Sequence, residues 1–338
     1  MARKCLVTGF AGFIGSHLSD RLLEEGYTVV GVDNFSTGTI ENVQRLNKKH
    51  ANLPAGRIHF VRGDLFDRDV IFEIFRVHPD IEWVFHQAAL GSIPRSLRNP
   101  QNTFESNVVA FNNVLGAVLQ HRQNVKRFVF ASSSSIYGKC ADGARVETMD
   151  PVGWQKNPYG ASKYMNEVQA LAWAAAFGLE VIGLRYFNVF GPFQRADSEY
   201  AAVIPKWIRA VRSGEPMVIQ GTGKQKRDFT YVDNVVDANM LAAHAPSSAA
   251  NSCYNIGCGQ SVSLLDLQRE ITVHAAVRGI KSPWVEMVRA RENDIADAYA
   301  DINLARTYLN YEPKVDWKRG IKHTCELLLS ETELLAEP

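Results

Sequence analysis

A strand, a glycine-rich turn and a helix open the chain, and a second strand then ends at Asp33. Three glycines of the turn are spaced three residues apart: Gly9, Gly12 and Gly15. This order predicts a dinucleotide site, with backbone close to a pyrophosphate at the N-terminus of the helix. Asp33 suits the free hydroxyls of a ribose, whereas a 2′-phosphate would meet a like charge. The turn therefore predicts binding of NAD rather than NADP.

Apolar runs and helical patterns alternate through about the first 185 residues. The predicted strands are 4–8, 27–32, 58–62, 83–86, 128–131 and 181–184, and the clearest helices are 16–25, 102–120 and 159–177. Such alternation predicts an α/β fold with a right-handed, doubly wound parallel sheet of the Rossmann type. We expect residues 1–185 to form the NAD-binding domain and 186–338 a smaller α/β domain that binds substrate. Segments around 229–246 are predicted to return to the first domain.

Composition excludes several classes of protein. The formal net charge of the 338 residues is +1, so no nucleic-acid partner is expected. The chain has no apolar run long enough for a membrane span and no secretory signal pattern. Its five cysteines include no Cys-x-x-Cys pair and no metal-ligand spacing. We therefore expect reduced thiols, a cytoplasmic location and no metal site.

The stretch 128–163 carries the candidate chemistry. An apolar strand leads to a row of serines that includes Ser133, and Tyr159 and Lys163 follow four residues apart at the start of a helix. That spacing puts the phenol and the ammonium on one helical face. A nearby ammonium lowers a phenol pKa that is normally about 10, which allows proton exchange with a substrate hydroxyl near neutral pH. The Tyr-x-x-x-Lys pattern alone also occurs by chance in many helices.

Polar residues at other predicted strand ends have two interpretations each. Asp64 follows the third strand and either caps the next helix or accepts a hydrogen bond from an adenine amine. His86 ends the fourth strand, where a packing role is favoured over that of a catalytic base. Small residues follow it in Gln87-Ala88-Ala89, so backbone can approach the cofactor there. Asn107 interrupts an apolar helix and is predicted to be a buried polar anchor.

The whole chain resembles the extended short-chain dehydrogenase/reductase family, and within it the nucleotide-sugar 4-epimerases. The resemblance rests on ordered motifs along the sequence: Thr8–Gly15, Asp33–Ser36, Gly63-Asp64, His86–Ala89, Ser132–Gly138, Tyr159–Lys163, Leu184–Pro192, Arg227–Asp233 and Arg291–Asp294. One motif departs from the family pattern, because Asn293 stands where the family has glycine. Asparagine tolerates positive φ, so the turn is compatible with this residue.

The resemblance implies a set of roles, with NAD as cofactor and a UDP-sugar as substrate. The implied catalytic residues are Ser133, Tyr159 and Lys163. The implied cofactor-binding residues are Gly9, Gly12, Phe13, Ile14, Gly15, Asp33, Asn34, Ser36, Thr37, Gly38, Asp64, Leu65, Gln87, Ala88, Ala89, Asn107, Tyr159, Lys163 and Tyr186. The implied substrate-binding residues are Gly91, Ser92, Ser133, Ser134, Tyr159, Asn188, Gln194, Ala202, Val203, Arg227, Arg291, Asp294 and Ala298. The two long helices, 102–120 and 159–177, would pair with their copies in a homodimer, as in the family.

The residues after Ser133 discriminate between reactions of the family. Related 4,6-dehydratases carry Asp-Glu where this chain has Ser134-Ser135, and related decarboxylases keep a Glu at the second position. Without those acids, elimination lacks its proton donor and acceptor, so 4-epimerisation is favoured. A non-catalytic NAD-binding scaffold is the alternative from another class, but it would not need Ser133, Tyr159 and Lys163 together.

The size of the sugar depends on Ala298. In the family this position faces the 2-substituent, and a bulky residue restricts the site to plain hexoses. Alanine leaves room for an N-acetyl group, as in the UDP-N-acetylhexosamine subgroup, unless the neighbouring Tyr299 closes the pocket. The expected substrates are UDP-GlcNAc and UDP-GalNAc or the corresponding uronic acids. Arg95 or Arg195 would pair with a uronate, or both are surface charges.

Overall fold

The fold is that of a computed structural model, which describes residues 3–138, 142–197, 200–290 and 297–330. Two predicted substrate-binding residues, Arg291 and Asp294, lie outside these ranges, as does Asn293. None of the helices within the described ranges combines the length and apolar character needed to cross a bilayer.

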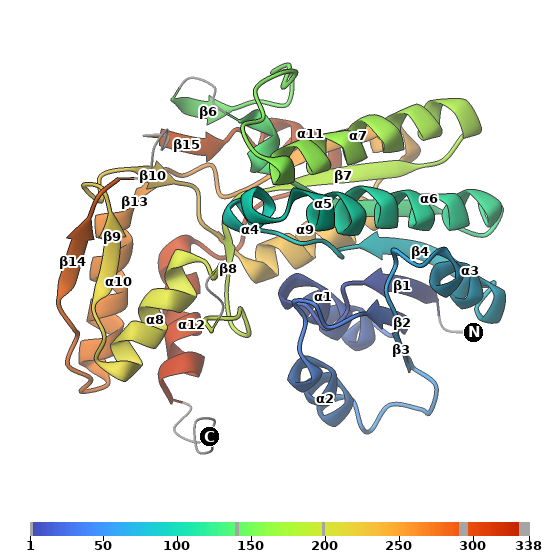
Figure 1. Cartoon of the computed structure of the whole chain (residues 1–338). Helices are drawn as coiled ribbons and strands as arrows, with labels where there is room; N and C mark the ends of the chain where they lie inside the picture. Colours follow the sequence, from blue (N-terminus) through green and yellow to red (C-terminus); the bar gives the residue numbers. More distant parts are fainter. Residues whose placement is uncertain (1–2, 139–141, 198–199, 291–296, 331–338) are drawn as a thin grey trace.

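A parallel sheet forms the centre of the molecule (Figure 1). Within the described residues it has seven strands in the order β12-β7-β5-β4-β1-β2-β3, and every neighbouring pair is parallel. The strands are β1 (Lys4–Thr8), β2 (Thr28–Asp33), β3 (Ile58–Arg62), β4 (Ile81–His86), β5 (Arg127–Ser133), β7 (Val181–Tyr186) and β12 (Ser252–Ile256). Every residue of β2, β5 and β7 is buried, as expected for parallel strands that are covered on both faces. The predicted Rossmann-type fold is confirmed.

Helices cover both faces of this sheet. One face carries α1 (Phe13–Glu24), α9 (Val232–His244) and α11 (Asn303–Leu309), whose apolar side chains share a core with the sheet. The other face carries α3 (Arg68–Val77), α6 (Ala110–Gln120) and α7 (Pro158–Phe177), with a second core. The short helix α2 (Ile40–Lys49) packs against α1. This arrangement leaves the carboxyl ends of the strands open for a ligand.

The predicted helix 102–120 is a composite. It begins as α5 (Pro100–Phe104), passes through a π-helical turn at Glu105–Val109 and continues as α6. The short helix α4 (Ile93–Arg98) precedes it. The other long helix, α7, begins where Asn157 accepts a hydrogen bond from the Gly160 N–H at 2.7 Å, and ends at the left-handed Gly178.

The second part of the chain packs three helices against short strands. The helices are α8 (Val203–Ser213), α10 (Leu264–Val277) and α12 (Trp317–Ser330), and their apolar side chains form a third core. The strands are β8 (Val189–Phe190), β9 (Met217–Gln220), β10 (Lys226–Arg227), β11 (Thr230–Tyr231), β13 (Val262–Ser263), β14 (Val285–Val288) and β15 (Asp297–Ala300).

The two parts exchange elements. Helix α9 packs on the seven-stranded sheet, and strand β12 pairs with its strand β7, although both elements come late in the sequence. Conversely β6 (Gly143–Arg145), from the first part of the chain, pairs with β15 in the order β13-β10-β15-β6. The division of the chain at residue 185 stays a prediction.

Candidate active site

A cavity of about 510 Å³ opens at the carboxyl ends of the central strands. It is lined by three of the predicted substrate-binding residues in addition to Tyr159: Gly91, Gln194 and Ala202. It is lined by most of the predicted cofactor-binding residues: Gly9, Gly12, Phe13, Ile14, Gly15, Asp33, Asn34, Ser36, Thr37, Asp64, Leu65, Gln87, Ala88, Ala89, Tyr159, Lys163 and Tyr186. The sheet therefore brings these residues together from five of its strand ends.

Other predicted site residues do not line this cavity: Gly38, Ser92, Asn107, Ser133, Ser134, Asn188, Val203, Arg227 and Ala298. Several of these residues instead make contacts within the protein. Ser92 caps α4, Asn188 donates a hydrogen bond to the Asp228 carbonyl oxygen at 2.9 Å, and Val203 begins α8. Their direct contact with a ligand stays a prediction.

The glycine turn can hold only glycines at two of its positions. Gly9 has a φ of +68°, and a Cβ on it would lie 2.8 Å from the Ala88 backbone nitrogen. A Cβ on Gly15 would lie 2.0 Å from the Gly9 carbonyl oxygen. The residue before α1, Gly12, makes no side-chain cap, so the first backbone N–H groups of the helix remain for a ligand. This cradle fits the diphosphate of a dinucleotide.

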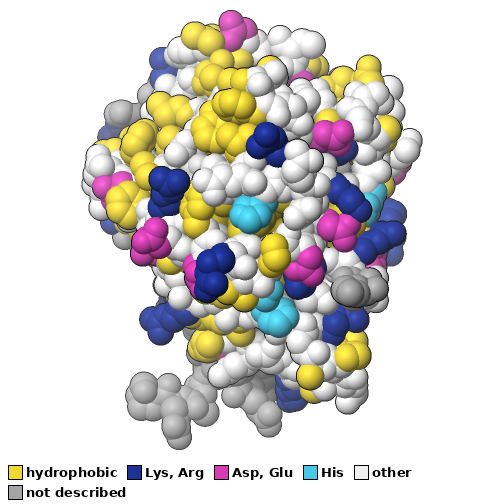
Figure 2. Space-filling view, turned by 90° about the vertical axis from the view of Figure 1, so that its right-hand side faces the viewer, with side chains coloured by type: hydrophobic (Ala, Val, Ile, Leu, Met, Phe, Trp, Pro, Cys, Tyr) yellow, Lys and Arg dark blue, Asp and Glu magenta, His cyan; other side chains and the backbone are white. Residues whose placement is uncertain are grey.

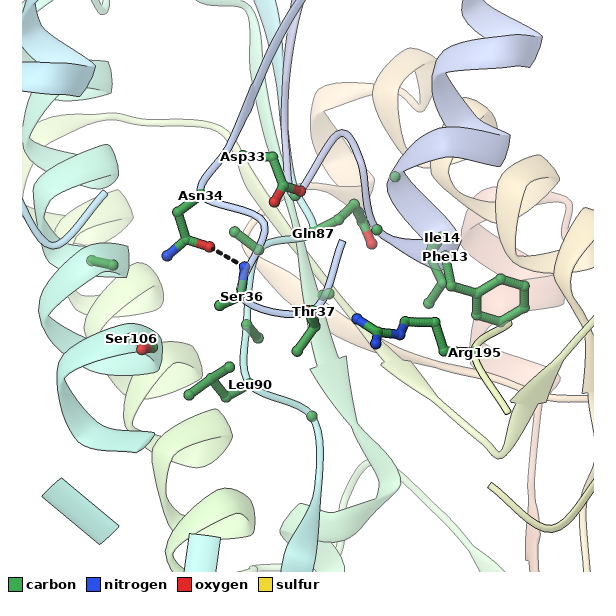
Figure 3. Close-up of a pocket in the computed structure, with 18 of the residues that line it drawn as sticks. Phe13, Ile14, Asp33, Asn34, Ser36, Thr37, Gln87, Leu90, Ser106 and Arg195 are labelled. Carbon is green, nitrogen blue, oxygen red and sulfur yellow. Dashed lines mark hydrogen bonds between the residues drawn. The ribbon is translucent and has the colours of Figure 1, made fainter. Parts of the chain in front are cut away.

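The Asp33 carboxylate ties the turn to the loop that follows β2. Its oxygens accept hydrogen bonds from the Ala11 N–H at 3.0 Å and the Phe35 N–H at 2.7 Å. Burial raises the pKa of this carboxyl, and the backbone hydrogen bonds oppose the change. Figure 3 shows Asp33 facing the cavity beside Asn34 and Gln87.

Asp64 does not cap α3, because Asp67 does so by accepting a hydrogen bond from the Asp69 N–H at 3.0 Å. Instead its carboxylate accepts from the Phe66 N–H and from the Asn34 side-chain amide, both at 2.9 Å. The capping interpretation of Asp64 is therefore wrong. An adenine contact stays a prediction.

Ser133, Tyr159 and Lys163 converge between β5 and the start of α7. The Ser133 hydroxyl accepts a hydrogen bond from the Ser135 N–H at 3.1 Å and lies close enough to the Tyr159 phenol to lower its pKa. The buried Lys163 ammonium donates to the Ala131 carbonyl oxygen at 2.8 Å. A proton-transfer group and a fixed cation, Tyr159 and Lys163, thus line the cavity, and a serine hydroxyl lies next to the phenol.

The electrostatics of this group differ from the expectation. Burial raises the pKa of Tyr159 above its ordinary value, and the hydrogen bond to Ser133 only partly opposes it. Burial also lowers the pKa of Lys163 to about 8, against the effect of the Glu167 carboxylate. The pKa of Tyr159 is therefore raised rather than lowered as predicted, because burial disfavours the charged phenolate.

His86 is a packing residue. Its ring is buried against Phe111, and Nδ1 is paired with the Thr8 hydroxyl at 3.0 Å. Burial and the nearby Lys163 charge lower the pKa of His86 to about 3, so it is neutral at physiological pH. This outcome matches the favoured interpretation of the sequence.

A closed ring of hydrogen bonds supports the floor of the cavity. The Tyr186 hydroxyl donates to the Gln87 side-chain oxygen at 3.1 Å, the Gln87 amide donates to Asn239 at 2.9 Å, and the Asn239 amide donates back to Tyr186 at 2.8 Å. The sequence does not predict this role of Asn239, because its hydrogen-bond partners lie 53 and 152 residues away.

Asn107 is an anchor rather than a lining residue. Its fully buried side chain accepts from the Leu90 N–H at 2.8 Å and donates to the Leu90 carbonyl oxygen at 3.3 Å and the Ser162 hydroxyl at 3.0 Å. The π-helical turn thereby joins the cavity-lining Leu90 to the helix of Tyr159 and Lys163.

The cavity has space beside Tyr159 and, at Gln194, an unpaired hydrogen-bond acceptor. A Cβ placed on Gly91 would lie 3.9 Å from the Tyr159 hydroxyl, so backbone borders the phenol closely. The Gln194 amide donates to the Val189 carbonyl oxygen at 3.0 Å, whereas its buried side-chain oxygen has no hydrogen-bond partner in the described part of the chain. That oxygen can accept a hydrogen bond from a ligand N–H or O–H.

Ala298 and Tyr299 are neighbours on β15, where Ala298 is paired with Arg227 on one side and Gly143 on the other. Successive side chains of a strand point to opposite faces. Tyr299 therefore cannot take the direction of Ala298 without a change of register.

Comparisons with known proteins agree with this geometry. The model of the NAD dependent epimerase/dehydratase family matches residues 5–257. A UDP-N-acetyl-alpha-D-glucosaminuronate decarboxylase of Bacillus cytotoxicus is 30% identical over 96% of this chain and 98% of its own.

Two solved structures share the fold over nearly their whole length. The UDP-N-acetylglucosamine 4-epimerase of Methanobrevibacter ruminantium, in complex with UDP-N-acetylmuramic acid, has a TM-score of 0.86 at 33% identity, covering 97% of this chain and 99% of that one. The UDP-glucuronic acid 4-epimerase of Bacillus cereus, in complex with UDP-glucuronic acid and NAD, has a TM-score of 0.84 at 30% identity, covering 96% and 99%.

Proposed function

The chain belongs to the NAD dependent epimerase/dehydratase family, and on that premise we propose that it is a UDP-sugar 4-epimerase acting on an N-acetylhexosamine or a hexuronic acid. One observation carries the proposal: Tyr159 and Lys163 line the same cavity as the glycine turn, and the Ser133 side chain lies next to the Tyr159 phenol. A proton-transfer group and a dinucleotide cradle in one cavity are what reversible oxidation of an alcohol requires.

NAD, when bound, supplies the acceptor and donor of the hydride at C4. The glycine turn and the N-terminus of α1 hold its diphosphate, and Asp33 its adenosine ribose. Tyr159 takes the proton of the sugar 4-hydroxyl while Ser133 orients that hydroxyl. Burial disfavours the phenolate of Tyr159, and we propose that the Lys163 ammonium, four residues on along α7, offsets part of that cost when the phenol is ionised. Once the turned 4-keto sugar has taken back the hydride on the other face of C4, Tyr159 would return the proton to the oxygen at C4. The cycle needs no second redox substrate.

The decarboxylase relative makes decarboxylation the alternative. Among the described residues that line the cavity, the acids are Asp33, the last residue of β2, and Asp64, which follows β3. Tyr159 lies over β5, which β4 and β1 separate from β2 in the sheet. No carboxyl group of the described lining is therefore close to the reacting end, which supports epimerisation.

Two features support a sugar with a substituent larger than hydroxyl. The small residues Gly91 and Ala202 line the cavity, and the free Gln194 oxygen suits an acetamido N–H. The guanidinium of Arg95 also lines the cavity and lies over the Tyr200 ring at 4.9 Å, which keeps a uronate among the candidates.

A panel of UDP-sugars tests this function. The purified protein is incubated with UDP-GlcNAc, UDP-GalNAc, UDP-glucose and UDP-glucuronic acid, and products are separated by chromatography. We expect 4-epimers of an N-acetylated or uronic substrate, lost in Tyr159→Phe. Release of CO₂ from a uronic substrate would support the decarboxylase instead, and no turnover of any member would refute the proposal.

The proposal includes a homodimer and a cytoplasmic location. Apolar side chains on the adjoining helices α4, α5 and α7 are 44–60% exposed: Leu97, Phe104, Met165 and Val168. Figure 2 shows hydrophobic side chains gathered in the upper part of one side of the molecule, at the height of α7 in Figure 1. Val168→Glu should give a monomer in light scattering, whereas Val277→Glu, on α10, should not. An unchanged mass for Val168→Glu would contradict this interface.

A further inference from the structure

The segment after β8 leaves the second part of the chain and packs on the first. Phe193 has a φ of +62°, a conformation that is rare for a bulky side chain and costs on the order of 1–3 kcal/mol. Its ring lies 4.1 Å from the Arg45 guanidinium of α2 and 5.6 Å from the His17 ring of α1. The strained backbone thus directs Phe193 between the two helices that flank the glycine turn.

Arg195 follows two residues later and lines the cavity. Figure 3 shows its side chain near Phe13 and Ile14, with the guanidinium directed toward Thr37. The pKa of Arg195 is raised, first by its hydrogen bonds to Asp197 and also by the charge of Glu41 in the first turn of α2. Arg195 therefore lies at the β2 side of the cavity, away from Tyr159.

The Arg195 guanidinium is hydrogen-bonded to one carboxylate, but not all of its N–H donors take part. Nε and Nη2 donate to the Asp197 carboxylate at 2.9 and 2.6 Å, which leaves Nη1 without a hydrogen bond among the described residues. The Arg195 side chain is 42% exposed and that of Asp197 is 63% exposed, so solvent screens much of their attraction. Arg195 thus presents a positive charge and an unpaired donor to the part of the cavity next to the glycine turn.

We propose that Arg195 is a cofactor-binding residue that binds the diphosphate of the dinucleotide, and that Phe193 anchors it to the cofactor side of the molecule. Arginine donors pair with phosphate oxygens in strong, charge-assisted hydrogen bonds. This contact comes from the second part of the chain, so that part helps to retain the cofactor. Retention matters because the same NAD must serve both hydride transfers. The inference rests on the proposed function only in requiring bound NAD.

The test is the release of NAD from the purified protein, followed by trapping free NAD with an excess of an NAD-consuming enzyme. We expect Arg195→Leu to release NAD about tenfold faster than the wild type. Arg195→Lys keeps the charge and should fall between the two. Phe193→Leu should also accelerate release, because the anchor is weakened. Added salt should accelerate release more in the wild type than in Arg195→Leu.

Arg269→Leu is the matched control, because Arg269 also pairs with an aspartate, Asp266, on the exposed surface of α10. It should release NAD at the wild-type rate. An unchanged rate for Arg195→Leu would overturn the inference. So would an unchanged rate together with a loss of uronic substrates alone, which would assign Arg195 to a sugar carboxylate. Protein that binds no NAD at all would refute the proposed function itself.

Discussion

The Lys163 ammonium donates a hydrogen bond of 2.8 Å to the carbonyl oxygen of Ala131, two residues before Ser133 on β5. The contact fixes a buried cation to the strand that carries the proposed catalytic hydroxyl. Helix α7 and strand β5 thus hold Ser133, Tyr159 and Lys163 in one arrangement.

The burial of Lys163 predicts a pH dependence of stability. Its pKa is about 8 in the folded protein, below the value of about 10.4 in an unfolded chain. Below pH 8 both states are protonated. Between those two values the unfolded state binds more protons, so the free energy of unfolding rises with pH, by about 3 kcal/mol in total. Denaturant unfolding of the wild type and Lys163→Met should diverge by most of this amount, about 2–2.5 kcal/mol, between pH 7 and 10. Parallel curves would contradict the buried cation.

Asp33 is predicted to set the choice between NAD and NADP. In Asp33→Asn the repulsion of a 2′-phosphate disappears, so the ratio of NAD to NADP bound from an equal mixture should fall about tenfold or more. The bound nucleotides are released by denaturation and quantified. Asp64→Asn, an acid in the same cavity, is the control and should keep the wild-type ratio. An unchanged ratio in Asp33→Asn would show that another group discriminates.

Asn107 should contribute strongly to stability. Asn107→Ala leaves the buried Leu90 N–H without its partner, so we expect a loss of about 2–3 kcal/mol in the free energy of unfolding. Asn112→Ala, on the same helix, removes only an exposed contact with Gln169 and should change stability by less than about 0.5 kcal/mol. Equal effects of both variants would refute the anchoring role.

Ala298 is predicted to admit the larger 2-substituents. Ala298→Tyr should reduce kcat/KM for N-acetylated substrates at least about tenfold more than for UDP-glucose. Tyr299 points to the other face of β15, so Tyr299→Ala should leave the preference unchanged. If Ala298→Tyr affects both kinds of substrate equally, the size argument fails.

Much of the fold can be predicted from short-range patterns in the sequence. Strands β1 and β3 begin and end at the predicted residues, because buried apolar runs bounded by turns are local signals. The glycine turn is also predicted from the sequence, because the close contacts that require glycine lie largely within a few residues of each other. The helix 102–120 was predicted as uniform, because its apolar stripe continues through the π-helical turn around Asn107.

Long-range properties could not be predicted in this way. The hydrogen-bonded ring of Gln87, Tyr186 and Asn239 joins three distant segments. The residues around Asn239 in the sequence give no indication of its hydrogen-bond partners. The pKa of Tyr159 depends on how completely the fold buries it, whereas the sequence shows only the spacing to Lys163. The position of the Arg195 side chain near Phe13 and Ile14 likewise follows from the folded chain and is not visible in the sequence.

The fate of a deuterium at C4 tests the central claim most directly. A UDP-N-acetylhexosamine labelled with deuterium at C4 is incubated with the purified protein in ordinary water, without added NAD, and the epimer is analysed by mass spectrometry. Transient oxidation at C4 predicts that the epimer keeps the deuterium, and that Tyr159→Phe forms it at least about a hundredfold more slowly. Loss of the deuterium to solvent would contradict hydride transfer through bound NAD.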